Sequence, residues 1–312
     1  FNNQNHFFTD GRYIEQSKEQ VKNCKIHIVG GPHFKFIAQN NLIHNGAAIG
    51  FESVHMSVSL FRCLSDSMAN IKWVESVGLI EEIAAVKDKL EIESLQTAID
   101  ITDEVFKQII PDLKVGAKER EIAAKISYLF KMNGADGDSY ESIIGSGRLG
   151  ALPHARPSDK KFEKGDFVVM DFGALYNGYH ADMTRTIVIG EASEKHKEIY
   201  NIVLDSQLAG INAAKEGITG AALDAVCRKV IDEAGYGSKF IHSTGHGIGL
   251  EVHTYPRISS FNNKPLLENY VVTIEPGIYI AGWGGVRIED DCLIRKNDCL
   301  PLNKSTKEML IL

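Results

Sequence analysis

Residues 167–190 read FVVMDFGALYNGYHADMTRTIVIG, a stretch that predicts a β-hairpin. Two apolar runs flank Asn177-Gly178, a dipeptide that favours a two-residue type I′ turn. A turn at that point sets Asp171 opposite residue 184. Because side chains alternate along a strand, Asp171 and Asp182 become diagonal neighbours on one face, roughly 7 to 8 Å apart at the backbone. Each aspartate taken alone could be an ordinary solvent-exposed residue of a strand. Asp is depleted in strands, however, and the two are close enough to share a metal centre.

Outside the hairpin, helical and strand patterns recur in the same order twice. Apolar residues at helical spacing, N-cap residues and closing glycines mark two helices in each round, and strands follow them. The predicted helices span residues 90–110, 118–132, 193–215 and 219–235, and the predicted strands span 140–144, 167–172, 179–189, 239–243, 270–275 and 286–295. This order predicts two similar halves around one sheet, in an α+β domain whose helices cover one face of a largely antiparallel sheet.

The first 80 residues predict a smaller α/β domain. Its patterns are strands at 25–29, 47–51 and 71–77 and a helix at 54–68. The chain therefore divides into a domain of residues 1–80 and a larger domain of residues 81–312. The first residues, FNNQNHFFTDGRY, lack an initiator methionine, so we expect that some sequence precedes residue 1.

The composition excludes several classes of partner. With 312 residues, a formal net charge of -7 and no basic run, the chain is expected to bind neither nucleic acid nor an anionic membrane. No apolar stretch approaches the ~18 residues of a membrane span. The 5 cysteines are scattered without metal-site spacing, which suits a reducing compartment, and we expect a cytoplasmic protein.

A glycine pattern raises the possibility of a nucleotide cofactor. In IGSGRLGALPHARPS, residues 144–158, Gly145, Gly147 and Gly150 match G-x-G-x-x-G. A dinucleotide cradle needs a helix that opens at the third glycine. Pro153 and Pro157 follow closely, and proline disrupts a helix interior by roughly 3 kcal/mol. We therefore expect no nucleotide.

Three further candidates lie in the second half. His246 stands among glycines in STGHGIGLEVH, Glu275 ends an apolar strand before Pro276-Gly277, and Glu289 shares a strand face with Arg287. Each also has an ordinary interpretation, since an isolated histidine is more often structural and Arg287 with Glu289 fits a salt-bridged surface strand. A carboxylate that ends a buried run, however, needs a partner.

The set counts for more than its members. Asp171, Asp182, His246, Glu275 and Glu289 form an oxygen-rich group with one imidazole, which suits harder divalent ions such as Mn²⁺, Co²⁺ or Zn²⁺. Two like charges 4 Å apart repel by about 4 kcal/mol at an effective dielectric of 20. Four packed carboxylates therefore need compensation, which two dications provide. Two-metal sites lower the pKa of bound water and generate a nucleophile.

Four segments now bring a family into view. DFGALYNGYHADMTRT, STGHGIGLEVH, TIEPGIYI and VRIEDD together resemble the proline-specific metallopeptidases of the methionine aminopeptidase, or pita-bread, fold, that is, Xaa-Pro aminopeptidases and prolidases. The likeness covers about residues 85–312, and residues 1–80 resemble part of the family's N-terminal domain. It implies a homodimer and two divalent ions, Mn²⁺ foremost, held by Asp171, Asp182, His246, Glu275 and Glu289, with Asp182 and Glu289 bridging.

The resemblance also assigns residues to the substrate. His154 matches the histidine of the family's PH segment, and His242 and His253 match its other two active-site histidines. Arg257 stands where prolidases carry a substrate-binding arginine, and Arg287 matches an arginine that orients the ligands. The implied reaction is metal-assisted amide hydrolysis, in which Glu275 transfers a proton to the prolyl nitrogen while His154 and His253 donate hydrogen bonds to the oxyanion.

The resemblance leaves several functions open. We expect an Xaa-Pro aminopeptidase that acts on peptides with proline at the second position, because the stretch from Pro256 to Lys264 has no long insertion to close the cleft. The alternative is an Xaa-Pro dipeptidase (prolidase), for which Arg257 could clamp the free carboxylate of proline. Methionine aminopeptidase is a further alternative with the same fold and ligand types. It is disfavoured, because its two glutamate ligands lie farther apart in the sequence than Glu275 and Glu289 do here. A metal-free binding protein on the same fold is disfavoured, because all five ligands are present.

Overall fold

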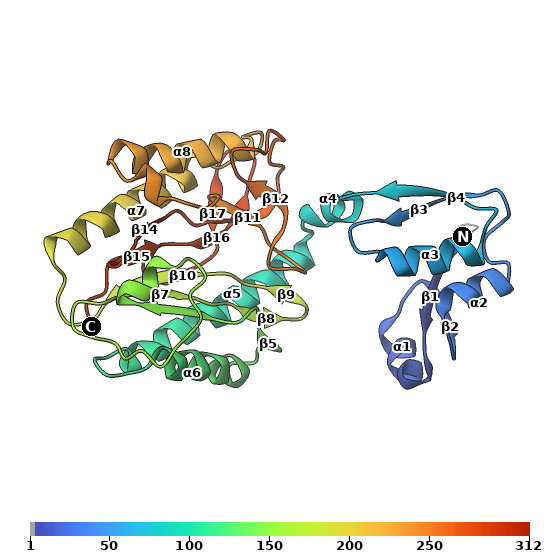
Figure 1. The fold of residues 1–312 in the computed structure, drawn as a ribbon, viewed down its shortest axis with the longest axis horizontal. Helices are drawn as coiled ribbons and strands as arrows, with labels where there is room; N and C mark the ends of the chain where they lie inside the picture. The colour runs from blue at the N-terminus through green and yellow to red at the C-terminus, as the bar shows by residue number, and fades with distance from the viewer. Residues whose placement is uncertain (1–3) are drawn as a thin grey trace. The chain divides into compact units, whose positions relative to one another are not determined.

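The computed structural model describes residues 4–312, and the chain divides into two compact units between Leu79 and Ile80 (Figure 1). The described part of the first unit, residues 4–79, contains two parallel strand pairs and three complete α-helices. The pairs are β1 (Asn5–Thr9) with β2 (Cys24–Ile28) and β3 (Ala48–Glu52) with β4 (Lys72–Ser76), and the helices are α1 (Ile14–Gln20), α2 (His33–Gln39) and α3 (Val58–Ser67). The helix predicted from residue 54 begins only at Val58, because the Ser57 side chain accepts a hydrogen bond from the Leu60 N–H and caps it there.

The second unit has the predicted order of two helices and then strands, twice over. The first half contains α5 (Lys89–Ile109) and α6 (Glu119–Met132), a sheet of order β10 (Thr184–Val188), β7 (Phe167–Asp171), β6 (Ile143–Ser146), and a small sheet of order β5 (Gly137–Asp138), β8 (Ala174–Tyr176), β9 (Tyr179–His180). A capping box between Asp88 and Glu91 fixes the start of α5.

The second half repeats the arrangement with a larger sheet. It contains α7 (Glu194–Ala213) and α8 (Gly220–Glu233), a sheet of order β12 (Thr254–Ile258), β11 (Gly245–Gly247), β13 (Val271–Ile274), β16 (Asp290–Ile294), β17 (Cys299–Pro301), and a hairpin of β14 (Gly277–Ile280) with β15 (Gly284–Arg287). All strand pairs named in this unit are antiparallel. Figure 1 shows the strands between the α5–α6 pair and the α7–α8 pair. The α+β fold is confirmed, and no helix within residues 4–312 is long and apolar enough to cross a bilayer.

The predicted hairpin has the predicted register. Asn177 and Gly178 have φ values of 50° and 81°, the left-handed conformation that a type I′ turn requires at both central residues. Asp171 pairs with Thr184, as the turn predicts. The strand predicted over 179–189 is interrupted between β9 and β10, because the Asp182 N–H turns away to the carboxylate of Asp291, 2.9 Å away.

Another predicted strand, 239–243, is absent. The segment contains a 3-10 turn (Gly237–Lys239) followed by irregular chain, and the strand begins only at Gly245. Arg228 of α8 donates hydrogen bonds to the carbonyl oxygens of Phe240 and His242, both at 2.9 Å. These carbonyl oxygens therefore bond to a helix side chain instead of to a neighbouring strand. The apolar alternation of the segment did not reveal that Arg228 competes for them.

Each half of the second unit has its own core, and the sheets end between them. Val168, Met170 and Phe172 pack with α5 and α6, whereas Val272 and Ile274 pack with α7 and α8. Asp171 and Thr273 alternate with these apolar residues along the strands, and both lie outside the two cores. The strand ends thus bring polar residues from both halves to one place.

Candidate active site

A cavity of about 400 Å³ lies where the two halves of the second unit meet. Every residue that the sequence analysis singled out for chemistry lines it: His154, Asp171, Asp182, His242, His246, His253, Arg257, Glu275, Arg287 and Glu289. These side chains come from sequence segments more than 100 residues apart. The cavity therefore depends on the tertiary structure of the second unit.

The five candidate metal ligands converge at the strand ends. Ligand atoms of Asp182, His246 and Glu289 lie within 4.8 Å of one another, and all three residues are buried. The Nε2 atom of His246 lies 3.3 Å from Oε1 of Glu275 and 3.7 Å from Oδ2 of Asp182. Asp171 and Asp182 contact the same hydroxyl, that of Tyr140, which confirms that the two aspartates face the same side of the hairpin.

Backbone and threonine contacts orient these ligands. The Nδ1 atom of His246 lies 3.1 Å from the carbonyl oxygen of Gly247, so Nδ1 carries the proton and Nε2 presents its lone pair to the acids. Thr184 donates to Glu289 across 2.5 Å, and Thr273 donates to Glu275 across 3.2 Å. These contacts thus orient ring and carboxylate atoms that could coordinate a metal ion.

Gly245 permits the close approach that places His246. A Cβ atom at residue 245 would lie 2.0 Å from the carbonyl oxygen of Thr273 in β13, far inside van der Waals contact. We expect Gly245→Ala to force β11 from β13 and to lower stability by about 1 to 3 kcal/mol, the usual range for overpacking. Thermal denaturation checks this, with Gly137→Ala as the control, because that glycine has no left-handed φ and its Cβ would meet nothing within 4 Å. Equal melting temperatures for Gly245→Ala and wild type would contradict it.

Burial dominates the electrostatics of the cluster. It raises the pKa of Asp182 and of Glu289 well above the ordinary values, and neighbouring carboxylates reinforce both shifts. Burial also raises the pKa of Glu275 to about 8, although Arg287 opposes the shift. The same burial lowers the pKa of His246 to about 3, so its imidazole is neutral.

The donor set fits divalent cations. Four carboxylates and one neutral imidazole meet in a largely buried space. Among the residues that line this space, Arg287 is the cationic side chain in direct contact with one of these acids, 2.5 Å from Asp171. One guanidinium cannot balance four acids. Two dications would, and their preference for carboxylate oxygens with an imidazole matches the atoms present.

Arg287 also begins a hydrogen-bond chain to His242. Its Nη1 atom donates to the hydroxyl of Tyr279 at 2.8 Å, and that hydroxyl lies 2.9 Å from Nε2 of His242. Burial lowers the pKa of His242 to about 4, and Arg287 adds to the effect. The His242 imidazole is therefore neutral, and its Nε2 atom accepts a hydrogen bond from the Tyr279 hydroxyl. The other three substrate candidates, His154, His253 and Arg257, are exposed at the cavity.

Sequence reasoning missed several residues around this cluster, among them Thr184, Tyr279 and Tyr140. Thr184 was within reach, because alternation from Asp182 puts it on the same strand face. Tyr279 bonds Arg287 and His242, but its place in an apolar strand gave no polar signal. Tyr140 meets both aspartates from a separate segment, and no spacing rule links it to them.

The fold and the buried acid–imidazole cluster fit a metal-dependent hydrolase, and comparisons with known proteins show the family. Residues 93–296 match metallopeptidase family M24, and residues 1–86 match the creatinase/prolidase N-terminal domain. The chain belongs to metallopeptidase family M24.

Three relatives show how close the similarity is. An Xaa-Pro dipeptidase from Pyrococcus furiosus is 45% identical over 297 residues, which is 95% of this chain and 83% of that protein. An Xaa-Pro dipeptidase structure from Bacillus anthracis has a TM-score of 0.94 and 41% identity, covering 98% of this chain and 86% of that one. An X-Pro aminopeptidase structure from Thermotoga maritima has a TM-score of 0.92 and 40% identity, covering 99% and 88%.

Proposed function

We propose that this chain is an Xaa-Pro dipeptidase, which hydrolyses dipeptides with a C-terminal proline. The sequence analysis favoured an aminopeptidase, but relatives described as Xaa-Pro dipeptidases support the alternative. The observation that carries the proposal is Arg257, an exposed guanidinium on the same cavity as the acid cluster. A dipeptide of this kind ends in a carboxylate close to the scissile bond, and a guanidinium suits that group.

In this proposal the acid cluster holds two divalent ions. Asp171, Asp182, His246, Glu275 and Glu289 would bind them. When bound, the ions polarise the substrate carbonyl and lower the pKa of a water molecule, so that a nucleophile exists at neutral pH. Mn²⁺ is the ion that we propose first, with Co²⁺ or Zn²⁺ as alternatives that the same ligands accept.

Glu275 is the proposed proton carrier. Its carboxylate lies beside His246 and is steadied by Thr273, so one oxygen is held while the group faces the cavity. It accepts a proton as water attacks the carbonyl carbon before proline, and it delivers that proton to the prolyl nitrogen as the amide bond breaks. Without that proton the proline would leave as an amide anion.

Histidines would stabilise the charge that develops on the carbonyl oxygen. His154 and His253 are exposed on the cavity and can donate through ring N–H groups. His242 is held by Ser243 and Tyr279 and lies deeper in the cavity, where it orients substrate or the neighbouring groups. Arg287 fixes Asp171 and Thr184 with its guanidinium.

Matched substrates test the choice between the two peptidases. We expect the metal-loaded protein to hydrolyse Met-Pro or Ala-Pro with kcat/KM at least about tenfold above that for Ala-Pro-Ala, because the tripeptide displaces the carboxylate from Arg257. The aminopeptidase remains the second candidate, favoured by the similar Thermotoga maritima protein. Faster hydrolysis of the tripeptide would select it and reject the dipeptidase.

Arg257→Met tests the clamp itself. Loss of a hydrogen bond to a charged group costs about 1.5 to 3 kcal/mol, so we expect kcat/KM for Ala-Pro to fall roughly 10- to 150-fold, mainly through KM. The control is Arg156→Met, which removes another exposed arginine from the same cavity, one that pairs with Glu141. If both variants lose activity equally, Arg257 has no special place in binding the carboxylate.

Two further expectations belong to the proposal. The family resemblance implies a homodimer, which size-exclusion chromatography with light scattering would measure. The scattered free cysteines suit a reducing compartment, and we propose the cytoplasm as the location.

A further inference from the structure

Arg185 is a buried arginine whose hydrogen bonds are saturated. Its side chain is 2% exposed, although it lies in the strand next to the candidate ligands. All five contacts of its guanidinium are short: Thr306 O at 2.9 Å, Thr184 O at 2.9 Å, Glu289 O at 2.6 Å, Asp290 Oδ1 at 2.7 Å and Ser305 O at 2.9 Å. A guanidinium has five N–H bonds in a fixed fork, so every donor has a partner here.

These contacts reach the backbone of the candidate metal site on the side away from the cavity. One nitrogen, Nη1, bridges the carbonyl oxygens of Thr184 and Glu289, whose side chains bond each other on the opposite side of the chain. The N–H of Glu289 also donates to the carbonyl oxygen of Thr184, at 3.2 Å. Arg185 thus fixes the peptide groups that aim the Glu289 carboxylate.

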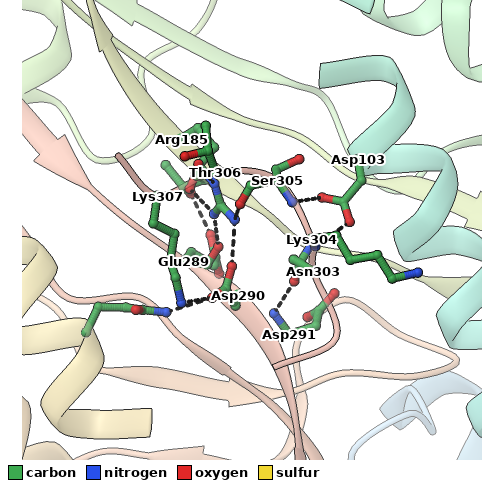
Figure 2. A network of polar contacts seen from close by, with 12 residues as sticks. Asp103, Arg185, Glu289, Asp290, Asp291, Asn303, Lys304, Ser305, Thr306 and Lys307 are labelled. Carbon is green, nitrogen blue, oxygen red and sulfur yellow. Dashed lines mark hydrogen bonds and ion pairs between the residues drawn. The ribbon is translucent and has the colours of Figure 1, made fainter. Parts of the chain in front are cut away.

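The other arms of Arg185 hold a segment near the end of the chain. We call residues Asn303–Lys307 the clasp, and Figure 2 shows them beside Arg185 and Asp290. The carbonyl oxygens of Ser305 and Thr306 accept from Arg185, and Lys307 pairs with Asp290 at 2.7 Å. Asp290 is 1% exposed and also accepts from Gln207, so its charge is fully compensated.

The clasp reaches a second candidate ligand as well. The side-chain oxygen of Asn303 accepts from the Asp291 N–H at 2.8 Å, and the Asp291 carboxylate accepts from the Asp182 N–H at 2.9 Å. At its outer side, Asp103 of α5 accepts from the N–H groups of Lys304 and Ser305, at 2.6 and 3.0 Å. One continuous network therefore links α5 and the clasp to the backbones of Asp182 and Glu289.

We propose that Arg185 and the clasp are positioning elements that preorganise Glu289 and Asp182 for metal binding; this rests on the metal role given to those acids above. Four buried acids that repel one another do not converge unaided, so their backbones must be held before an ion arrives. Arg185 supplies that restraint from outside the cavity, where it contacts neither ion nor substrate. It is therefore distinct from Arg287, which contacts the acids directly.

The experiment compares two variants with chelator-stripped, intact protein. Arg185→Lys keeps the charge but cannot reproduce five forked contacts. Tyr200→Phe is the control, because it removes one hydrogen bond to the clasp, 3.0 Å to the Lys307 carbonyl oxygen, without touching Arg185 or the ligands. Calorimetric titration with Mn²⁺ alone measures affinity, and circular dichroism checks that each variant is folded.

We expect Arg185→Lys to bind Mn²⁺ about 10- to 100-fold more weakly than wild type, the usual effect of losing an outer partner of a metal ligand, and Tyr200→Phe to bind within about threefold of wild type. At limiting Mn²⁺ we expect the kcat of Arg185→Lys to fall while its KM changes little. Excess Mn²⁺ should restore much of the rate of this variant. If Arg185→Lys does not fold, Asp103→Asn, at the residue of α5 that holds the clasp, must weaken Mn²⁺ binding in the same direction, by a smaller factor.

The outcomes separate this inference from the proposed function. The positioning role is overturned if Arg185→Lys and Tyr200→Phe bind Mn²⁺ with equal affinity. Where Asp103→Asn replaces Arg185→Lys, it is overturned if Asp103→Asn binds Mn²⁺ as tightly as wild type. Either result leaves the peptidase proposal intact. A wild-type protein that binds no Mn²⁺, Co²⁺ or Zn²⁺ overturns both. Tight metal binding without hydrolysis of any Xaa-Pro peptide overturns the proposed function alone.

Discussion

Asp182→Asn is expected to abolish hydrolysis and to lower Mn²⁺ affinity by more than about 100-fold, since even outer partners of metal ligands contribute 10- to 100-fold. Asp182 is 4% exposed, lies beside His246 and Glu289, and is a proposed metal ligand. Asparagine has the same shape but no charge. We expect kcat/KM to fall at least about 1,000-fold, because loss of one transition-state hydrogen bond alone costs 10²- to 10³-fold.

Stability distinguishes this loss from unfolding. In chelator, Asp182→Asn should melt no lower than wild type, because it removes one of several buried carboxylates that raise one another's pKa. Asp205→Asn on the exposed side of α7 controls for the same chemical change. A variant that retains more than a tenth of wild-type kcat/KM would refute the role of Asp182, and a large drop in melting temperature would make the loss structural.

The second large effect is a pH-dependent stability that depends on Glu275. Without metal, we expect Glu275→Gln to become progressively more stable relative to wild type as the pH rises from about 5 to about 8. The difference should grow by up to about 1.4 kcal/mol per pH unit, the slope for one proton bound by one state and not by the other.

The sign follows from the direction of the pKa shift. Burial raises the pKa of Glu275 from 4.5 in the unfolded chain to about 8 in the folded protein. The folded state therefore keeps a proton that the unfolded state releases, and the stability that this gives is complete below pH 4.5 and lost as the pH rises through 8. His246 and Lys87, whose pKa values burial lowers to about 3 and about 8, titrate in both proteins and cancel in the difference.

Calorimetry of both proteins at pH 5, 6, 7 and 8, in chelator and in Mn²⁺, measures this. Metal needs ionised ligands, so the stabilisation of wild type by Mn²⁺ should increase over the same range, with ~2.7 kcal/mol expected at a concentration 100 times Kd. In Glu275→Gln that increase should be smaller. Parallel pH curves for the two metal-free proteins would show that Glu275 is ionised throughout, contrary to its burial among acids.

Residue patterns predicted the parts of the fold that depend on near neighbours. The register of the hairpin followed from Asn177-Gly178, whose left-handed conformations few other dipeptides adopt. The four long helices followed from apolar spacing and caps, as at Ser193. Prediction failed at 239–243, because the competitor for those carbonyl groups, Arg228, is distant in sequence from the strand pattern it interrupts.

The candidate site shows the same division. Charge and residue type in the sequence pointed to the four acids and one imidazole that converge on the cavity, because four packed carboxylates need compensation by cations. Tyr140, Tyr279 and Arg185 escaped notice, since each acts through partners that only folding brings near.

The sequence by itself determined which chemistry is available: four carboxylates, histidines and arginines, a hairpin that places two aspartates on one face, and the order of helices and strands. These depend on alternation, capping and turn conformation, which act over a few residues. The tertiary structure decided which atoms meet. It brought His246 to 3.3 Å from Glu275, joined Glu289 to Thr184 across 2.5 Å, and enclosed Arg185 among five acceptors, because hydrogen bonds between remote segments depend on where packing leaves each group.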